Sequence, residues 1–209
     1  MTGANQSCSA GISTSSDASS AIPQAAVDSA KLRFLDTIAV MIAGSRHPST
    51  LISLEVARQM GGNPVASVVG HKDKTSSPLA GHLNAVAAHA LEYDDLTPDI
   101  THMSSSMVPG CLAAAEKLDL SGRQLMEAFA LGFEVAGRIS LGMTSLAMLD
   151  RGFHTPGMMG GMGVAVAAAR MMGLDAEGVR MAIGLMASSG TGIRKNVGSA
   201  GKAFHVGNG

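Results

Sequence analysis

The residues best suited to chemistry lie in one polar stretch, from Leu91 to His102. Only 15% of the 209 residues are charged, yet this stretch holds one histidine and four carboxylates: Glu92, Asp94, Asp95 and Asp99. It directly follows an apolar helical pattern, which Pro98 stops. A polar loop on a rigid helix is where binding and catalytic groups tend to lie. A solvated acidic loop is the competing interpretation.

Two further segments bring candidate site residues. His154 lies in the loop from Arg151 to Gly157, and Lys202 and His205 lie near the last residue. His102, His154 and Lys202 are each expected at a junction between a loop and a helix, and all three helices are expected to belong to the same bundle. We therefore expect His102, His154 and the Lys202 ammonium to converge on one cleft. A structural role for each histidine is the alternative.

Other kinds of site are less well supported. Asp94, Asp95, His102 and His154 are all metal-ligand types, but no HxxxH or HExxH pair places two ligands on one helix face. Ser104 to Ser106 lack a nucleophile elbow, and Cys111 falls inside a helical pattern. The glycines from Gly160 to Gly163 lack the spacing of a phosphate-binding loop. We therefore expect no metal site, no nucleophilic serine or cysteine and no phosphate-binding loop.

Helices must position these groups. Apolar residues recur at helical spacing, which predicts an all-α bundle with one short strand over 65–69. Ser77, one of Ser104 to Ser106, a Ser121–Gln124 capping box and Asp175 are expected to begin helices. The small residues of 156–172 predict close packing at the centre. The first helix, over 23–44, is expected to bury Ala26, Val27, Ala30, Phe34, Ile38, Met41 and Ile42.

The composition excludes several classes of function. The net charge is −1 and no basic patch is present, so we expect no nucleic-acid partner. No apolar run is long enough to span a membrane, and no secretory signal is recognisable. Two distant cysteines, Cys8 and Cys111, fit a reducing cytoplasm. Residues 1–21 read as a disordered Ser/Gly/Ala-rich tail, and 22–209 as one helical domain with Ala, Gly and Met filling its core.

Several segments, in order and at similar spacing, resemble the MmgE/PrpD family from about Ile22 to the last residue. They are Leu35–Ala39, Ala43–Gly44, Ala88–Asp95, His102, Ser121–Gly122, Gly132–Val135, Arg138–Ile139, Arg151–His154, Gly173–Asp175, Ala182–Gly184 and Lys202–Gly207. Two places depart from the family pattern. His102 is followed by Met-Ser where the family has Pro-Ser, and His154 by Thr-Pro where it has Pro-Thr.

The resemblance implies a cofactor-free lyase for small di- or tricarboxylates, most like 2-methylcitrate dehydratase. The alternatives are cis-aconitate decarboxylase-like and iminodisuccinate epimerase-like activity, or a non-catalytic helical oligomerisation module. It further implies His102, His154, Lys202 and Asp94 as catalytic residues and Asp95 and His205 as substrate-binding residues. Glu92 is a weaker candidate.

The resemblance also implies a homodimer, and a family α+β domain that would follow Gly209. We therefore expect the chain alone to leave the apolar helix over 156–172 partly uncovered and to self-associate. With the pocket open on one side, little turnover of 2-methylcitrate is expected.

Overall fold

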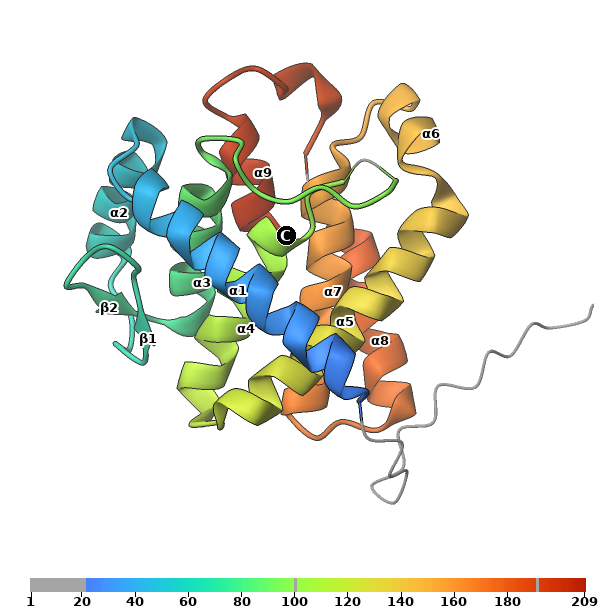
Figure 1. Cartoon of the computed structure of the whole chain (residues 1–209). Coiled ribbons are helices and arrows are strands. Elements are labelled where there is room, and N and C mark those ends of the chain that lie inside the picture. The colour runs from blue at the N-terminus through green and yellow to red at the C-terminus, as the bar shows by residue number, and fades with distance from the viewer. Residues whose placement is uncertain (1–21, 100, 191) are drawn as a thin grey trace, which may run out of the picture.

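The computed structural model describes residues 22–99, 101–190 and 192–209, and these residues form a helical bundle (Figure 1). The expected all-α fold is confirmed, whereas the tail predicted over 1–21 lies outside the described residues. The helices are α1 (Gln24–Gly44), α2 (Pro48–Met60), α3 (Ser77–His89), α4 (Ser104–Leu118), α5 (Gly122–Met143), α6 (Ser145–Asp150), α7 (Thr155–Met171), α8 (Ala176–Ser189) and α9 (Lys202–Asn208). A 3-10 turn, η1, covers Arg194–Asn196.

Helix α7 lies at the centre, where it packs against α4, α5, α8 and α9. Nearly every residue of its first half is buried, from Thr155 to Gly163. In its second half, Val164, Ala165, Ala168 and Met171 are only half-buried, so the expectation that this helix is partly uncovered holds for that half alone. Small residues make the burial of the first half possible: a Cβ at Gly132 of α5 would overlap the carbonyl oxygen of Gly163. Close helix packing around 156–172, as predicted, is confirmed.

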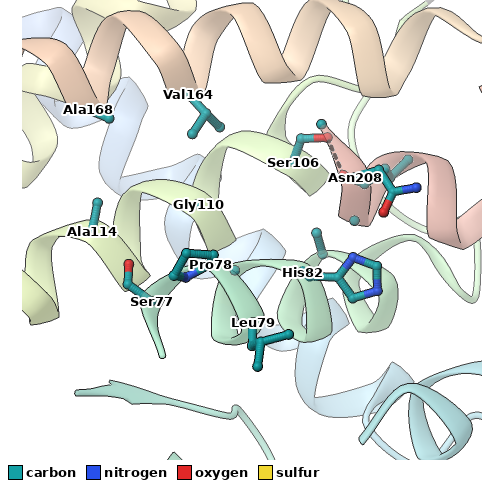
Figure 2. Close-up of a pocket in the computed structure, with 15 residues that line it drawn as sticks. Ser77, Pro78, Leu79, His82, Ser106, Gly110, Ala114, Val164, Ala168 and Asn208 are labelled. Atoms are coloured by element: carbon teal, nitrogen blue, oxygen red, sulfur yellow. Dashed lines mark hydrogen bonds between the residues drawn. The ribbon is translucent and has the colours of Figure 1, made fainter. Parts of the chain in front are cut away.

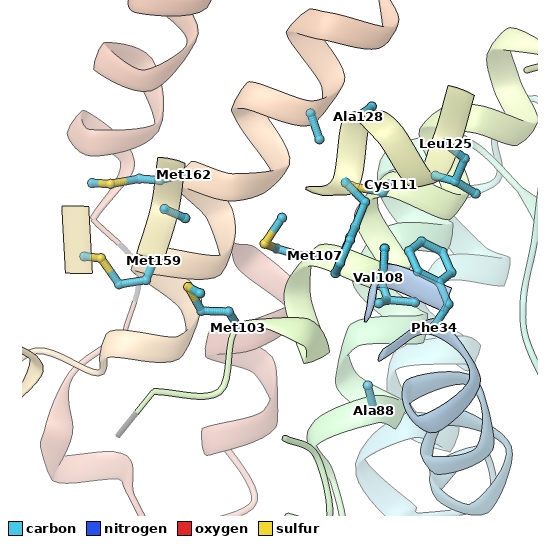
Figure 3. Close-up of a cluster of buried hydrophobic side chains, with 14 of the residues drawn as sticks. Phe34, Ala88, Met103, Met107, Val108, Cys111, Leu125, Ala128, Met159 and Met162 are labelled. Atoms are coloured by element: carbon cyan, nitrogen blue, oxygen red, sulfur yellow. The ribbon is translucent and has the colours of Figure 1, made fainter. Parts of the chain in front are cut away.

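Methionine and alanine fill most of the core (Figure 3). Met103, Met107 and Met159 are fully enclosed beside Val108 and Cys111. Phe34 and Phe129 meet edge to face, with their ring centroids 5.0 Å apart. Flexible thioethers suit the irregular space that closely packed glycine-rich helices leave between them.

The strand segment is shorter than predicted. The strand expected over 65–69 reduces to β1 (Ala66–Ser67), which pairs antiparallel with β2 (Lys74–Thr75). Glu116 of α4 anchors this hairpin, because its carboxylate accepts the Ser67 amide at 2.7 Å. Strand β1 packs against α3 and α4, so the hairpin forms a small cover over these two helices.

Some predicted helix starts are correct and others are wrong. The Ser121–Gln124 capping box forms, and Asp175 accepts the Gly178 amide at 2.8 Å. Ser77 is already helical, and its hydroxyl donates to the Ala113 carbonyl instead of capping α3. None of the three serines predicted to cap α4 does so, because Met103 stands at that position.

One predicted core residue of α1 is also misplaced. Ile42 is 56% exposed, because the buried face of α1 continues through Val40, Met41 and Gly44 instead. Within the described residues, no helix is both long and apolar enough to cross a membrane.

Candidate active site

Four histidines and Asp94 form a compact group, here called the histidine cluster: His89, His102, His154 and His205 with Asp94. The ring centroid of His89 lies 5.2 Å from that of His102 and 5.9 Å from that of His154. The rings of His154 and His205 are 5.2 Å apart. The structure thus brings together three histidines predicted from separate segments and adds His89, which lies between His102 and His154.

Helix ends deliver these side chains. His89 is the last residue of α3, His102 lies two residues before α4, and His154 directly precedes α7. Lys202 opens α9, and His205 lies one turn later on the same helix. The proline at the start of α7 fixes its first turn, and the chain after α3 leaves the helix before the acidic stretch. Rigid helices therefore hold the cluster from four directions.

Asp94 orients two of the histidines. Its buried Oδ2 accepts a hydrogen bond from His89 Nδ1 at 2.8 Å and lies 3.4 Å from His102 Nδ1. Burial alone would raise the pKa of Asp94, but the hydrogen bond from His89 and the nearby charges of His89 and His102 outweigh it and lower the pKa. Asp94 therefore stays ionised and directs His89 Nε2 away from itself, as an orienting carboxylate should.

His154 behaves differently from a solvent-exposed histidine. Burial lowers its pKa, and the neighbouring charges of His89, His205, Lys202 and His102 lower it further, to about 3. The ring is therefore neutral at neutral pH. A neutral imidazole can donate one hydrogen bond and accept another without adding charge to the site.

Lys202 contributes the positive charge. Its side chain is only 9% exposed, and its Nζ lies 2.7 Å from Oε2 of Glu92. Both residues line a cavity of about 300 Å³, which also contacts His89 and Ser199. This Lys202 cavity is at the lower end of the size range of small-molecule pockets, roughly 300–1,000 Å³.

Unpartnered polar atoms concentrate in the cluster. Among the described residues, five buried side-chain atoms lack a hydrogen-bond partner, and four belong to this group: His89 Nε2, Asp94 Oδ1, His154 Nδ1 and His205 Nδ1. Buried polar groups are nearly always paired, because an unpaired one costs about 1–3 kcal/mol. Four together indicate a site built to contact something other than the chain itself.

Asp95, predicted to bind substrate, is engaged within the chain. Its carboxylate pairs with Arg33 and accepts the Ser104 hydroxyl at 2.7 Å. Arg33 in turn lies over the Phe133 ring at 4.2 Å. Asp99 is held in the same manner by the hydroxyls of Ser140 and Ser145. These two carboxylates fasten the acidic loop to the bundle.

His205 lies at the edge of the cluster. Its Nε2 is 3.2 Å from the Asn196 side-chain amide, and burial followed by the charge of His89 lowers its pKa. The thiol of Cys111 is remote from this chemistry, because complete burial raises its pKa to about 12. A protonated thiol is a poor nucleophile.

A metal ion has one group of potential ligands within the described residues. Ligand atoms of His89, Asp94 and His102 all lie within 4.8 Å of one another. Asp95 and His154, the other two candidate ligands named in the sequence analysis, are not part of this group. Two imidazoles and a carboxylate would suit a divalent transition metal.

A larger cavity, about 470 Å³, lies elsewhere, between α3, α4, α7 and α9 (Figure 2). Small and apolar side chains such as Ala114, Val164 and Ala168 face it together with His82. Its described lining holds no Lys, Arg, Asp or Glu. A multiply charged ligand is therefore better matched by the smaller Lys202 cavity.

The sequence interpretation missed His89 as a site residue. The pattern offered a usable signal, because His89 ends an apolar helix and Asp94 follows five residues later. This spacing lets the chain turn back after the helix, so that the Asp94 carboxylate can accept a hydrogen bond from the His89 ring. The spacing of seven residues from His82 indicated only that the two histidines share a helix face.

Comparison with known proteins identifies the family of this chain. The chain is 29% identical over 187 residues to cis-aconitate decarboxylase of Homo sapiens, covering 87% of this chain and 39% of that protein. It is 28% identical over 180 residues to a cis-aconitate decarboxylase-like protein of Aspergillus oryzae, covering 82% and 37%. The chain thus spans less than half the length of these relatives. Since the MmgE/PrpD N-terminal domain matches residues 15–209, the chain belongs to the MmgE/PrpD family.

Proposed function

We propose that the histidine cluster and Lys202 form the acid–base site of a lyase that acts on a small di- or tricarboxylate. The observation that carries this proposal is the group of four unpartnered buried atoms beside a buried ammonium. A ligand with several carboxylates offers acceptors for imidazole N–H groups and for Lys202. The names of the relatives favour decarboxylation of cis-aconitate as the reaction.

Each side chain then has a distinct role. Lys202 and neutral His154 hold carboxylates of the substrate, while His205 borders their site. As one carboxylate leaves as CO₂, the electron pair of the broken C–C bond passes into the adjoining unsaturated carboxylate. Lys202 stabilises the added negative charge. This electrostatic stabilisation is strongest where water is excluded. Protonated His102 or His89, each beside Asp94, then delivers a proton to carbon.

Dehydration of 2-methylcitrate is the second candidate. It needs a base for an acidic C–H bond and an acid for the departing hydroxide. His89 fits the base, because Asp94 holds its Nδ1 and leaves Nε2 unpartnered. His102, 18% exposed at its side chain, fits the acid. The same pair of histidines therefore suits both reactions.

A test in D₂O separates the two reactions. Protein in excess over substrate is incubated with cis-aconitate or 2-methylcitrate, and products are followed by ¹H NMR. Decarboxylation should give an unsaturated dicarboxylate with one deuterium at the newly protonated carbon, whereas dehydration should give an unsaturated tricarboxylate without new deuterium. Protein in excess makes slow conversion detectable.

Two variants of α3 provide the control. His89→Gln should reduce the rate by roughly 10²–10⁴-fold, the usual contribution of one acid–base group. His82→Gln makes the same change two turns earlier on the helix, beside the other cavity, and should keep the rate. Equal losses in both variants, or no product from the unaltered protein with either substrate, would contradict the proposed function.

A further inference from the structure

Glu92 forms a contact that the proposed reaction does not use. Its carboxylate lies 2.7 Å from the Lys202 ammonium, and both residues line the Lys202 cavity. The hydrogen bond from Lys202 is the main reason that the pKa of Glu92 is lowered, with further lowering by the charges of Lys202, His89 and His102. Glu92 is thus a carboxylate held at a cation beside the cluster.

The two partners differ in their freedom to move. The Lys202 side chain is almost fully enclosed, while the Glu92 side chain is 53% exposed. Glu92 also has a left-handed backbone, with φ at 54°, in the turn where its amide donates to the His89 carbonyl. Glutamate rarely adopts this conformation, so the turn positions its side chain at some cost. Because its side chain is more than half exposed, the Glu92 carboxylate can swing into solvent.

Lys202 cannot lose this partner without a replacement. An enclosed ammonium that loses its counter-ion bears a large desolvation penalty. Among the described residues, Glu92 is the carboxylate paired with it. A ligand carboxylate that enters the cavity presents the same charge and the same acceptor atoms. Exchange of one carboxylate for the other keeps the ammonium paired throughout.

On the basis of the proposed function, we propose that Glu92 is a specificity-determining residue, an internal carboxylate that occupies Lys202 until a substrate carboxylate replaces it. Such an exchange yields little net free energy at Lys202 itself. Affinity must then come from the other carboxylates of the ligand, bound by the histidine cluster. A monocarboxylate such as acetate has no such second contact and is left unbound, whereas a di- or tricarboxylate gains enough to displace Glu92.

Two substitutions at Glu92 test this exchange. Glu92→Gln removes the charge, and Glu92→Asp keeps it but shortens the side chain so that it no longer reaches Lys202. Both should lower the Kd of cis-aconitate by roughly two- to fivefold, the range for loss of a partly exposed ion pair. The Kd is measured by calorimetry on the 209-residue chain. Acetate should show measurable binding only in the two variants.

The alternatives give different results. Tighter binding in Glu92→Gln alone would show a general charge effect, and weaker binding in both would show that Glu92 positions Lys202. Either result overturns the inference, as does absence of cis-aconitate binding in all three proteins. A ¹³C NMR titration of the Glu92 carboxyl adds an independent readout, because saturating cis-aconitate should raise its lowered pKa.

The product assay keeps the two proposals separate. Turnover of cis-aconitate with no change of Kd in either variant would refute the exchange and leave the lyase reaction standing. Tighter binding in both variants without any product would refute the reaction and leave the exchange standing.

Discussion

At the scale of single residues, the histidine cluster places charged and neutral groups side by side. Asp94 remains ionised because His89 donates to it, while burial keeps His154 neutral a few ångströms away. Groups whose pKa values are pushed apart are typical of sites where one accepts a proton and another donates a hydrogen bond. The same burial links His154 to the stability of the fold.

The first prediction concerns the pH dependence of stability. The pKa of His154 falls from 6.5 to about 3 on folding. Between these values the unfolded chain binds more protons than the folded chain, so this histidine makes stability fall as the pH falls. His154→Gln should therefore flatten the dependence of the unfolding free energy on pH between 6.5 and 4. The slope should decrease by up to about 1.4 kcal/mol per pH unit.

Urea unfolding of both proteins at several pH values measures these slopes. Histidine NMR provides the direct check, since the His154 ring should show no titration above pH 5. Equal slopes together with a ring that titrates near 6.5 would show that His154 is not held neutral.

The sequence predicted part of this cluster. His102, His154 and His205 were identified because a histidine at a loop–helix junction is conspicuous in a chain with few charges. The sequence did not show which way Asp94 and Asp95 point, because neighbouring residues in a loop differ in direction in ways that periodicity does not reveal. The structure separates them, since Asp94 faces His89 and Asp95 faces Arg33.

At the scale of elements, the acidic loop is fastened at the start of α4. The amide and hydroxyl of Ser104 both bond to Asp95, which also pairs with Arg33 of α1. Asp95 thereby does for α4 what a capping residue usually does from within the helix sequence. No local pattern could reveal this cap, because the carboxylate lies nine residues before the serine.

The second prediction follows from this contact. Asp95→Asn removes the charge that Arg33 and the N-terminus of α4 share, and should lower the unfolding free energy by about 1–2 kcal/mol. Urea unfolding measures the change. Asp28→Asn is the control, because its pair with Lys31 is exposed on both sides and its loss should leave the midpoint unchanged. An Asp95→Asn midpoint equal to that of the control would show that the loop does not depend on this cap.

The third prediction concerns the packing of α5 on α7. Gly132→Ala places a Cβ against the Gly163 carbonyl, and since backbone must move, it should destabilise the fold by about 1–3 kcal/mol. Gly137→Ala, in the same helix, meets only the end of Met103 at 3.8 Å. It should stabilise the fold by about 0.5–1 kcal/mol through helix propensity.

Thermal unfolding compares these two variants under identical conditions. Shifts in the same direction would indicate that the two helices are not in close contact. The sequence already indicated this close packing through its small residues in 156–172, but which glycine of α5 meets which residue of α7 depends on the crossing of the helices. Periodicity along one helix carries no information about that crossing.

At the scale of the whole molecule, apolar surface also lies where the sequence did not place it. The first half of α7 is buried, whereas α1, which crosses the front of the bundle in Figure 1, has a second, exposed apolar face. Leu32 and Leu35 are each 69% exposed, and Ala39 and Ile42 continue the stripe at helical spacing. This outer stripe explains why Ile42 was predicted to be buried, because periodicity cannot tell which of two apolar faces of a helix points inward.

The last prediction is that the chain associates through this outer stripe of α1. Large apolar side chains in a row on one helix form a surface that soluble monomers rarely leave uncovered. Leu35→Glu should weaken association, since burial of an unpaired carboxylate in the contact is costly, while Lys31 one turn away keeps the helix stable in the monomer. Leu185→Glu on α8, at a residue 68% exposed, makes the same change on another helix and should leave association unaltered. Sedimentation velocity at several concentrations measures both. A concentration-independent monomer for the unaltered chain would refute association, and a loss of association caused by Leu185→Glu alone would move the contact from α1 to α8.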